Sequence, residues 1–571
     1  MKKIFTLLFL AALSIGLYAE QQVSGVVVDS KGEPVIGASI QAKGTTQGTI
    51  SDYDGKFEME VPESVKTLVI SFVGMATQEV AAGKNIKVVM SENSELIQEV
   101  VVTGYGNVSK GSFAGSAQAV SADDIEKKSP TEISKALAGE VAGVQVVTTT
   151  GQPGEAASVR IRGIGSLNAS SAPLYIVDGV PYEAEYISTI DPGDIASTTI
   201  LKDATATSLY GSRGANGVIV ITTKKGASGE EGRIDVDIKY GANMRMLPMY
   251  DVITDPQEFV EMAWMSLYNA SSRATESGKA KDASDMLFGP KGIPEPYNLW
   301  QVVNADGSIN TNPKGTLLIG NNGKFLGAED GVQYKPGMNN LLSWRDAIFR
   351  VGQKLDATVK ISGGTEKTTY YTSIGYLKDE GYYIGSTYDR FTVRSNVDFK
   401  PKKWLKGNVN MAYTYSNQNR AGQGDNMNSG FVYVNQMAPV FPVFLYNADG
   451  TIQIDPKTGG NAYDYGMFEG YGRPFGSGIN PAGSLRYDRD NIVQHYVMAG
   501  GSLEFKFYKD LKLIVNANLQ YRGAKESEFT NSYYGDAGGI GRIAVEQNEQ
   551  LWITAQQLLE YNKTLNEHSI R

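Results

Sequence analysis

Residue types able to carry covalent or metal chemistry are scarce in this chain of 571 residues. It contains no cysteine and only two histidines, His495 and His568, which stand far apart in the sequence. A thiol nucleophile, a disulfide and a cysteine-based zinc site are therefore excluded. No serine lies in the sharp strand-to-helix turn that exposes a hydrolase nucleophile. We expect no catalytic residues and no enzymatic activity.

Two short patterns resemble binding loops, but neither has the full set of ligands. Asp52-Tyr53-Asp54-Gly55 offers carboxylates for calcium, yet an EF-hand loop would place ligands at Ile50 and Val61, which cannot bind the ion. The Asp-Gly pair is typical of a hairpin turn. Gly163-x-Gly165 could begin a dinucleotide loop, but Asn168 stands where the third glycine belongs. We therefore expect no metal and no cofactor.

Charge and hydropathy narrow the class of protein. The chain has 53 Lys and Arg against 62 Asp and Glu, which argues against a nucleic-acid binder with a basic face. No internal run approaches the roughly 20 apolar residues of a membrane helix. Residues 1–19 carry two lysines, an apolar stretch and a small-residue end at Ala19, which predicts a signal peptide.

The elements that follow predict two compact domains. Residues 20–92 contain strand-like runs at 23–28, 38–42, 56–61 and 67–72, separated by turn residues, which predicts an Ig-like β-sandwich. Residues 107–228 predict an α/β block. Its first helix should begin at an N-cap Ser129, with Pro130 in the first turn and Glu132 closing a capping box, and should end near Ala138. A second helix, 203–210, should stop at Gly211.

From residue 229 onward the pattern becomes strict alternation of apolar and polar residues. Clear runs lie at 234–240, 391–399, 405–415, 503–507 and 513–521. Segments of about ten residues, tilted by about 40°, rise about 25 Å, the height of the apolar band of an outer-membrane barrel. The connections alternate between short turns and long loops at 244–354, 417–494 and 523–550. We expect about eight membrane strands, with a capped helix beginning at Asp255 in the first long loop.

Several motifs resemble those of SusC/RagA-type TonB-dependent outer-membrane transporters. Val23-x-Gly25-x-Val27-x-Asp29 and Ser51-Asp52-x-Asp54-Gly55-x-Phe57 look like the carboxypeptidase-regulatory-like domain of that family. The α/β block resembles its plug domain, and we call it the plug. The plug motif positions are Arg160, Arg162, Gly163, Asp178, Gly179, Lys202, Asp203, Tyr210, Gly211, Arg213, Gly214, Asn216 and Gly217.

A short β-prone segment between the two domains resembles the TonB box of the family. It follows an acidic stretch and precedes a glycine-rich break, which suits addition of a strand to a partner's sheet. One more strand of the sandwich is the alternative interpretation. The box residues are Glu99, Val100, Val101, Val102, Thr103, Gly104 and Tyr105.

The resemblance implies a mainly β fold and a transport function. The domains would be a signal peptide (1–19), a sandwich (20–92), the box and linker (93–106), the plug (107–228) and the first part of a 22-stranded transmembrane β-barrel (229–571). Eight strands enclose too little space for a plug of about 120 residues, so we expect the chain to be an N-terminal portion. The predicted location is the outer membrane, with the sandwich and box in the periplasm.

The implied partners are TonB with its inner-membrane motor, a SusD-like surface lipoprotein acting as a lid, outer-membrane lipid, and a glycan or, alternatively, an oligopeptide as cargo. We also expect Arg160, Arg162 and Arg213 to pair with carboxylates of the barrel wall. Five loop aromatics are candidates for cargo contact, with loop-on-loop packing as the alternative; they are Phe431, Tyr433, Tyr463, Tyr465 and Tyr471. A secreted β-rich adhesin would share the signal and the strands, but it would need neither the box nor the plug motifs.

Overall fold

A computed structural model describes residues 20–571 apart from short gaps. The gaps are 30–31, 46, 73–74, 76, 91–99, 103–106, 110–116, 129, 167–169, 230, 247, 314, 423–428, 469–470, 509, 562, 566–567 and 571. The chain divides into two compact units, each described here by itself. The N-terminal unit comprises Met1–Val101 and Asn107–Phe113, and the main unit comprises Val102–Gly106 and Ala114–Arg571.

The N-terminal unit is a β-sandwich, as predicted. One sheet has the order β4-β1-β7 and the other β3-β2-β5-β6. Apolar residues of both sheets, such as Val27, Ile40 and Ile70, are fully buried between them. The strands are β1 (Glu20–Asp29), β2 (Ser39–Ala42), β3 (Gly48–Ile50), β4 (Lys56–Pro62), β5 (Thr67–Ser71), β6 (Gln78–Ala81) and β7 (Ile86–Met90).

The acidic pattern after β3 forms a turn. The Asp52 carboxylate accepts hydrogen bonds from the backbone N–H groups of Asp54 (3.0 Å) and Lys56 (2.7 Å). Gly55 has a φ of 72°, a left-handed conformation that favours glycine. The predicted turn is therefore present, but it joins β3 and β4, which belong to different sheets. The prediction of a hairpin at Asp54-Gly55 is wrong in that respect.

The plug is built on a five-stranded sheet with the order β10-β15-β16-β13-β14, beside a separate pair β11-β12. Its strands are β10 (Ala117–Ser121), β11 (Val144–Val147), β12 (Ser158–Ile161), β13 (Leu174–Val177), β14 (Val180–Tyr182), β15 (Ile195–Leu201) and β16 (Val218–Thr223). Its helices are α2 (Ala122–Lys127), α3 (Ile133–Ala136) and α4 (Ala204–Thr207), with 3-10 turns η2 (Ala184–Thr189), η3 (Pro192–Asp194) and η4 (Ser208–Gly214). The buried core between these elements includes Ile125, Ile133, Val177, Ile195 and Ile219.

The first plug helices differ from the sequence prediction. Helix α3 has Glu132 as its N-cap, because the buried Glu132 carboxylate accepts the N–H groups of Ser134 (2.8 Å) and Lys135 (3.0 Å). The prediction that Ser129 caps this helix is therefore wrong, and Ser129 itself lies outside the described residues. The preceding helix α2 was not predicted. Gly211 has the expected positive φ (58°), but the turn continues to Gly214.

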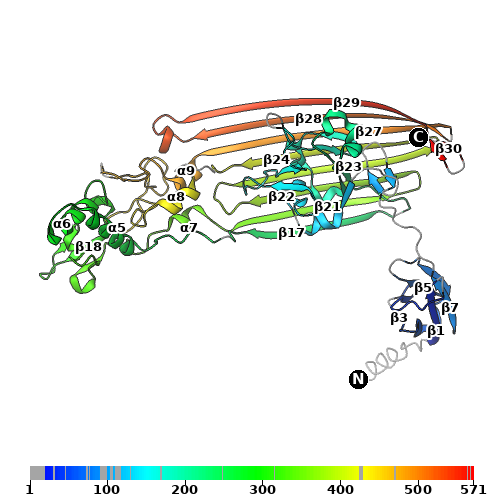
Figure 1. The fold of residues 1–571 in the computed structure, drawn as a ribbon, viewed down its shortest axis with the longest axis horizontal. Coiled ribbons are helices and arrows are strands. Elements are labelled where there is room, and N and C mark those ends of the chain that lie inside the picture. Colours follow the sequence, from blue (N-terminus) through cyan, green and yellow to red (C-terminus); the bar gives the residue numbers. More distant parts are fainter. Residues whose placement is uncertain are drawn as a thin grey trace, which may run out of the picture. The chain divides into compact units, whose positions relative to one another are not determined.

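The largest sheet of the remaining chain is antiparallel and eight-stranded, and we call it the wall (Figure 1). Its strands follow the order of the sequence, as expected for a barrel-type sheet. They are β17 (Arg233–Asn243), β21 (Gly352–Gly364), β22 (Thr368–Glu380), β23 (Thr387–Lys402), β24 (Leu405–Asn419), β27 (Arg489–Tyr508), β28 (Leu511–Thr530) and β29 (Arg542–Tyr561).

The two faces of the wall reverse the distribution of apolar and polar side chains that is usual in a water-soluble protein. Ile553 is 73% exposed, whereas Asn396 is 1% exposed. The exposed apolar set includes Ile234, Val236, Ile238, Tyr240, Ile374, Phe391, Met411, Leu503, Leu519 and Ile543. The buried polar set includes Thr358, Lys360, Ser373, Arg390, Arg394, Asn410, Thr414, Gln418, Asn518 and Gln520. Alternation along each strand sends the apolar set outward and the polar set toward the plug.

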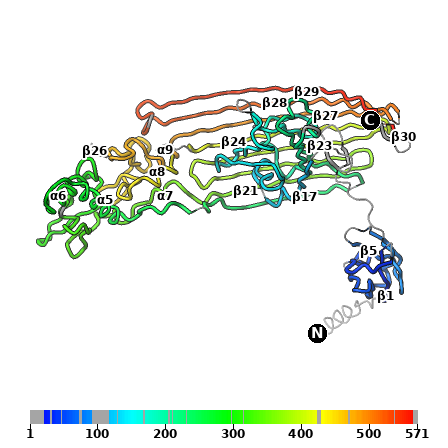
Figure 2. Tube along the Cα trace, in the orientation of Figure 1, coloured from blue at the N-terminus to red at the C-terminus, as the bar shows by residue number. Residues whose placement is uncertain are grey.

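The connections between wall strands are long at one end of the sheet and short at the other (Figure 2). The two longest, residues 244–351 and 420–488, fold together around a shared aromatic core. They carry α5 (Pro256–Ala270), α6 (Glu276–Leu287), α7 (Trp344–Ile348), α8 (Gly430–Gln436), α9 (Pro481–Tyr487) and short strands such as β18 (Trp300–Val303). The predicted cap at Asp255 is confirmed. None of the described helices is long and apolar enough to cross a membrane.

The third long connection is shorter than predicted. The alternation suggested a loop at 523–550, but β28 runs to Thr530 and β29 begins at Arg542. In the added part of these strands both faces carry polar residues, for example Lys525, Glu526 and Ser527. The strands therefore extend past the segment in which apolar and polar residues alternate.

Candidate functional site

Two buried ion pairs join the plug to the wall. Arg394 of β23 lies with its Nε 3.3 Å from Oδ2 of Asp194, and Arg390 of the same strand lies 3.7 Å from Oδ1 of Asp191. Asp191 is the N-cap of the single turn η3, and Asp194 is its last residue. Tyr371 of β22 donates a further hydrogen bond to Asp194 at 2.9 Å. We call these four charged residues the latch, because they connect two parts of the chain about 200 residues apart.

The latch holds charges almost completely away from water. Its four side chains are between 2% and 7% exposed. Burial, reinforced by the neighbouring Asp191, raises the pKa of Asp194 although Arg394 opposes the shift. Arg390 also donates to the backbone carbonyls of Thr131 (2.9 Å) and Ser188 (3.2 Å). Each charge depends on its partners, since an unpaired buried charge is strongly unfavourable.

The predicted arginine contacts are not formed with the eight described strands of the wall. We expected Arg160, Arg162 and Arg213 of the plug to reach carboxylates of the wall. Arg213 instead lies 3.5 Å from Glu183 of the plug, at the surface. Among the ion pairs of the described residues, none involves Arg160 or Arg162. The arginines of the latch belong to the wall and the carboxylates to the plug, the reverse of the predicted arrangement.

Sequence reasoning missed the latch, although a signal was present. Arg390 and Arg394 are four apart on one strand, so they share a face, and that face carries polar residues throughout. Asp191-Pro192-Gly193-Asp194 sets two carboxylates around a tight turn. Each pattern is visible alone, but nothing in the sequence brings the two together.

A cluster of aromatic rings closes the plug against β27 and β29. Tyr186 stacks on Tyr496 at 5.9 Å between ring centroids and lies 5.5 Å from the ring of Trp552. Tyr182 is 5.8 Å from Tyr496. We call these four residues the aromatic seal. Gln520 of β28 fixes it, since its Oε1 accepts from the Tyr496 hydroxyl (2.7 Å) and its amide donates to the Pro181 carbonyl (3.1 Å).

The plug motif residues stabilise the plug itself. Asp178 accepts hydrogen bonds from the backbone N–H of Thr223 (2.9 Å) and from its hydroxyl (2.6 Å), which joins β13 to the end of β16. Asp203 is the N-cap of α4. Lys202 donates to the Ala142 carbonyl at 3.1 Å. Asn216 donates to the Ser170 carbonyl at 2.9 Å. The motifs thus fix the shape of the plug.

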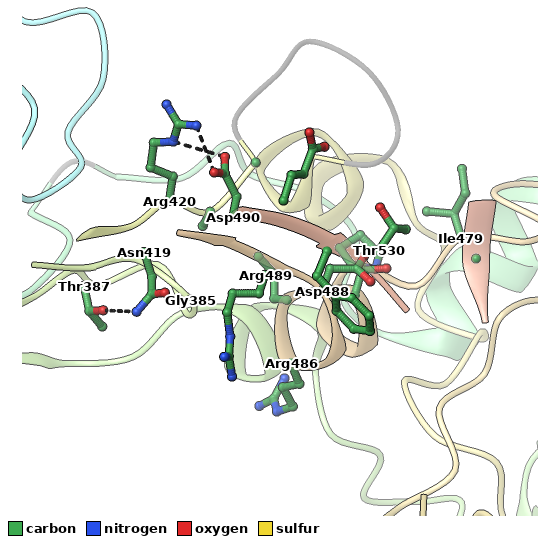
Figure 3. Close-up of a pocket in the computed structure, with 18 of the residues that line it drawn as sticks. Gly385, Thr387, Asn419, Arg420, Ile479, Arg486, Asp488, Arg489, Asp490 and Thr530 are labelled. Carbon is green, nitrogen blue, oxygen red and sulfur yellow. Dashed lines mark hydrogen bonds and ion pairs between the residues drawn. The ribbon is translucent and has the colours of Figure 1, made fainter. Parts of the chain in front are cut away.

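A cavity lies where the ends of β24, β27 and β28 meet the long connections (Figure 3). Its volume is about 560 Å³. Arg420 crosses one side and contacts Asp490 at 2.8 Å and Glu526. Further charged side chains line it, namely Arg350, Arg486, Arg489, Asp488 and Glu528. We call this cavity the outer pocket.

A reciprocal pair of hydrogen bonds connects the plug to the rim of the outer pocket. Gln152 of the plug donates to the Ala421 carbonyl (3.0 Å) and accepts the Ala421 N–H (2.9 Å). Gln418 donates to the Pro153 carbonyl at 2.8 Å. Ala421 lines the outer pocket, so a plug residue and the pocket share one backbone segment.

Most of the loop aromatics proposed for cargo contact lie inside the loop core. Tyr433, Tyr463 and Tyr465 are buried, and Phe431 stacks on Tyr383 at 4.7 Å. The prediction that these four contact cargo is not supported in this conformation, and the alternative of loop-on-loop packing accounts for them. Tyr471 is 44% exposed and differs from the others.

A buried ion pair organises the loop core. Arg473 and Asp464 are 2.9 Å apart, and both side chains are 0% exposed. Tyr433 and Arg473 are joined by a 2.6 Å hydrogen bond, and Tyr297 donates to Asp464 at 3.0 Å. Burial raises the pKa of Asp464 although Arg473 opposes the shift. This network accounts for Tyr433, whereas Tyr463 packs on Phe444 and Tyr465 stacks on Tyr534.

The predicted TonB box is described only in part. Val100–Val102 forms the short strand β8, which pairs with β9 (Asn107–Ser109). Glu99, Thr103, Gly104 and Tyr105 lie outside the described residues.

Comparisons with known proteins decide the family. Residues 109–218 match the TonB-dependent Receptor Plug Domain, and residues 23–102 match the CarboxypepD_reg-like domain. The chain is 30% identical over 567 residues to the TonB-dependent receptor SusC of Bacteroides thetaiotaomicron, covering 95% of this chain and 49% of SusC. It is 30% identical to the TonB-dependent receptor P3 of Formosa agariphila, covering 100% of this chain and 49% of that receptor.

Solved structures agree with these relatives. The RagAB peptide importer in its open-open state has a TM-score of 0.63 and 27% identity, covering 82% of this chain and 47% of that chain. The chain belongs to the SusC/RagA-type TonB-dependent receptors. Receptors of this family lie in the outer membrane, and the homologues are transporters rather than enzymes. This SusC/RagA-type chain spans about half the length of the curated relatives it matches.

Proposed function

We propose that this receptor imports a bulky nutrient across the outer membrane with energy delivered through TonB. The observation that carries the proposal is a folded plug held against the polar face of a barrel-type wall by buried ion pairs and stacked rings. A lumen filled in this way passes a large molecule only after those contacts break. Breaking buried charge contacts requires work, which TonB and its inner-membrane motor would draw from the proton gradient.

The TonB contact is assigned to residues Glu99 to Tyr105. The β-branched run Val100–Val102 favours extended backbone, and its described part is a short strand. A peptide of this kind binds by adding a strand to the edge of a partner's sheet, where backbone hydrogen bonds supply affinity. This assignment places the box and the N-terminal unit in the periplasm, and the long connections outside the cell.

The proposed domain boundaries follow from the same interpretation of the chain as a TonB-dependent importer. We assign 1–19 to a signal peptide, 20–92 to the sandwich, 93–106 to the box and linker, 107–228 to the plug and 229–571 to part of a 22-stranded barrel. In a complete barrel the long connections 244–351 and 420–488 would present the outer pocket to a SusD-like lipoprotein, which would act as a lid over the cargo.

The proposed cargo is a glycan, with an oligopeptide as the alternative. Similarity to SusC and to a solved structure described as a peptide importer supports import itself, without separating the two. The charged lining of the outer pocket favours the alternative, because guanidinium and carboxylate groups match the ends of a peptide. The uncharged polar residues of the wall beside the β13–β14 turn of the plug, such as Asn410 and Asn516, favour a glycan, because carboxamides both donate and accept hydrogen bonds.

Deletion of residues 99–104 in the full-length receptor tests the proposal. We expect uptake of labelled cargo to be lost, while cargo binding at the cell surface and heat-modifiable migration of the extracted barrel stay unchanged. Unimpaired uptake in this deletion would contradict energy coupling through the box. Absence of heat-modifiable migration in the unaltered receptor would instead favour a secreted adhesin.

A further inference from the structure

A strip of uncharged polar side chains lines the inner face of the wall beside the plug. It consists of two adjacent rows that run across β24, β27, β28 and β29. The first row pairs Asn408 with Ser502, Ser502 with Asn516, and Asn516 with Gln556. The second row runs in the same way through Asn410, Gly500, Asn518 and Thr554. We call these eight residues the amide strip.

The amide strip faces a cavity of about 190 Å³, which all eight of its residues line. The opposite side of the cavity is the β13–β14 turn of the plug, at Asp178 and Gly179. Gly500 lets the Asn518 amide lie close against β27, since a Cβ there would lie 2.4 Å from the Asn518 side-chain nitrogen. The strip is therefore separated from the plug by space large enough for several water molecules.

One amide of the strip has unused hydrogen-bonding capacity. Asn410 is 8% exposed, yet its side-chain oxygen accepts no hydrogen bond from any described residue. A buried polar atom without a partner is uncommon and calls for a ligand or water. Asn410 lines the cavity, so a rotation of its amide would turn this buried oxygen toward a molecule that enters.

The aromatic seal adjoins the amide strip on the same strands. Met498 is the next inward-facing residue after Gly500 along β27, and it lines the cavity. Its sulfur accepts a hydrogen bond from the Tyr182 hydroxyl. Beyond it lies Tyr496, in contact with Tyr182 and Tyr186. Farther along β27, the alternate residues that face inward lead to Asp490, which lines the outer pocket. Outer pocket, aromatic seal and amide strip thus follow one another along β27.

We propose that cargo passes the plug along this face of β24 and β27–β29, with the aromatic seal as the gate and the amide strip as an uncharged conduit selective for hydroxyl-rich chains. The proposal rests on the proposed import function and adds the route and its selectivity. Carboxamides both donate and accept hydrogen bonds, so a strip of them can exchange partners with successive hydroxyl groups.

The chemistry of the strip disfavours charged cargo. None of its eight residues carries a charged side chain, and the Asp178 carboxylate on the plug side of the cavity already accepts two hydrogen bonds from Thr223. A carboxylate group moving along the strip would therefore lose water without gaining an opposite charge. The buried ion pairs of the latch lie on β23, and Arg522 of β28 lies 4.8 Å from the Tyr186 ring of the aromatic seal. The free-energy cost of leaving water is far smaller for a hydroxyl group than for a charged group. The ring faces of a sugar can also lie against the tyrosines of the aromatic seal.

A pair of tryptophan substitutions on one strand tests the route. Asn516→Trp fills the conduit, whereas Val515→Trp places the same bulk on the opposite, outward face, since side chains alternate along a strand. The assay uses the full-length receptor in its own cell, and the cargo is the glycan on which growth is lost when the receptor is deleted. We expect at least a tenfold fall in uptake for Asn516→Trp, normal uptake for Val515→Trp, and unchanged surface binding for both.

A second variant avoids any folding defect. These 571 residues contain no cysteine. In a full-length receptor from which any other cysteine has been removed, Asn516→Cys offers a single thiol that can be modified after assembly, and Val515→Cys is its matched control. Labelling with a bulky maleimide should block uptake by the Asn516→Cys receptor, and the labelled Val515→Cys control should remain active. Adding cargo under a working proton gradient should also increase the labelling rate at 516 and not at 515.

The outcomes separate the route from the function beneath it. Wild-type uptake in Asn516→Trp, or in the modified Asn516→Cys receptor, overturns the route while import stands. Uptake that survives collapse of the proton gradient overturns energy-coupled import. Loss of growth on a peptide mixture, with no glycan affected by deleting the receptor, overturns the proposed selectivity for hydroxyl-rich chains.

Discussion

Arg394 of the wall and Asp194 of the plug form an ion pair in which the side chains are 5% and 2% exposed. Their sequence separation of 200 residues makes this pair a direct connection between two independently patterned parts of the chain. The neighbouring pair Arg390–Asp191 repeats the arrangement four residues along β23. The strength of this latch determines how firmly the plug is seated.

Replacing Arg394 with methionine should loosen the plug, because it leaves Asp194 buried without its partner. Loss of one partner of a buried pair costs about 3–5 kcal/mol. Arg213→Met is a matched control, since the Arg213–Glu183 pair is about half exposed and such pairs contribute about 1 kcal/mol or less. The unfolding temperature of each full-length variant, monitored by its heat-modifiable migration, measures the two effects. Equal destabilisation by the two substitutions would contradict a specific role for the latch.

The latch should also respond to pH. Burial, reinforced by Asp191, raises the pKa of Asp194 in the seated plug, whereas a solvent-exposed aspartate has a pKa of about 3.9. An acid that holds its proton more tightly in the seated state contributes stability below its ordinary pKa and loses that contribution as pH rises through the raised value. Asp194→Asn should remove this component. Unfolding temperatures across a pH series check it, and identical pH profiles for the two proteins would contradict it.

The loop core predicts opposite outcomes for two tyrosines. Tyr433 is fully buried and shares a 2.6 Å hydrogen bond with Arg473, so Tyr433→Ala should destabilise the connection by about 3–5 kcal/mol and expose it to proteases. Tyr471 is 44% exposed, so Tyr471→Ala should leave protease resistance unchanged. Limited proteolysis of intact cells measures both effects. Reduced cargo binding in Tyr471→Ala alone would identify a direct contact, whereas equal protease sensitivity would refute the assignment of the core.

The architecture was largely predictable because each part has a local signal. Alternation with a period of two identified the wall strands, and turn residues separated the strands of the sandwich. The prediction failed where the local signal ended. In β28 beyond Arg522 both faces become polar, so the pattern predicts a loop, although the backbone pairing with β29 continues to Thr530.

The site was less predictable because its contacts are non-local. The sequence predicts that Glu132 closes a capping box. In the structure its buried carboxylate alone caps α3, and it also accepts a hydrogen bond from the Ser134 hydroxyl. Arg160 and Arg162 stood out because they belong to plug motifs, whereas Arg390 and Arg394 looked like ordinary lumen residues. Which polar residue of the wall meets which residue of the plug depends on the register between them, and no short segment encodes that register.

The aromatic seal should control leakage through the complete barrel. Tyr496 contacts both plug tyrosines and is held by Gln520, so Tyr496→Ala removes the ring at the centre of the seal and opens space between plug and wall. Purified full-length Tyr496→Ala receptor in planar bilayers should therefore conduct ions without TonB, whereas Tyr496→Phe, which keeps the ring, should remain nearly closed. His495→Ala is the positional control, since the neighbouring His495 points outward beside Tyr413 and should not affect conductance. A silent Tyr496→Ala channel would show that the plug blocks the lumen elsewhere, and that the rings of this cluster stabilise the wall without gating it.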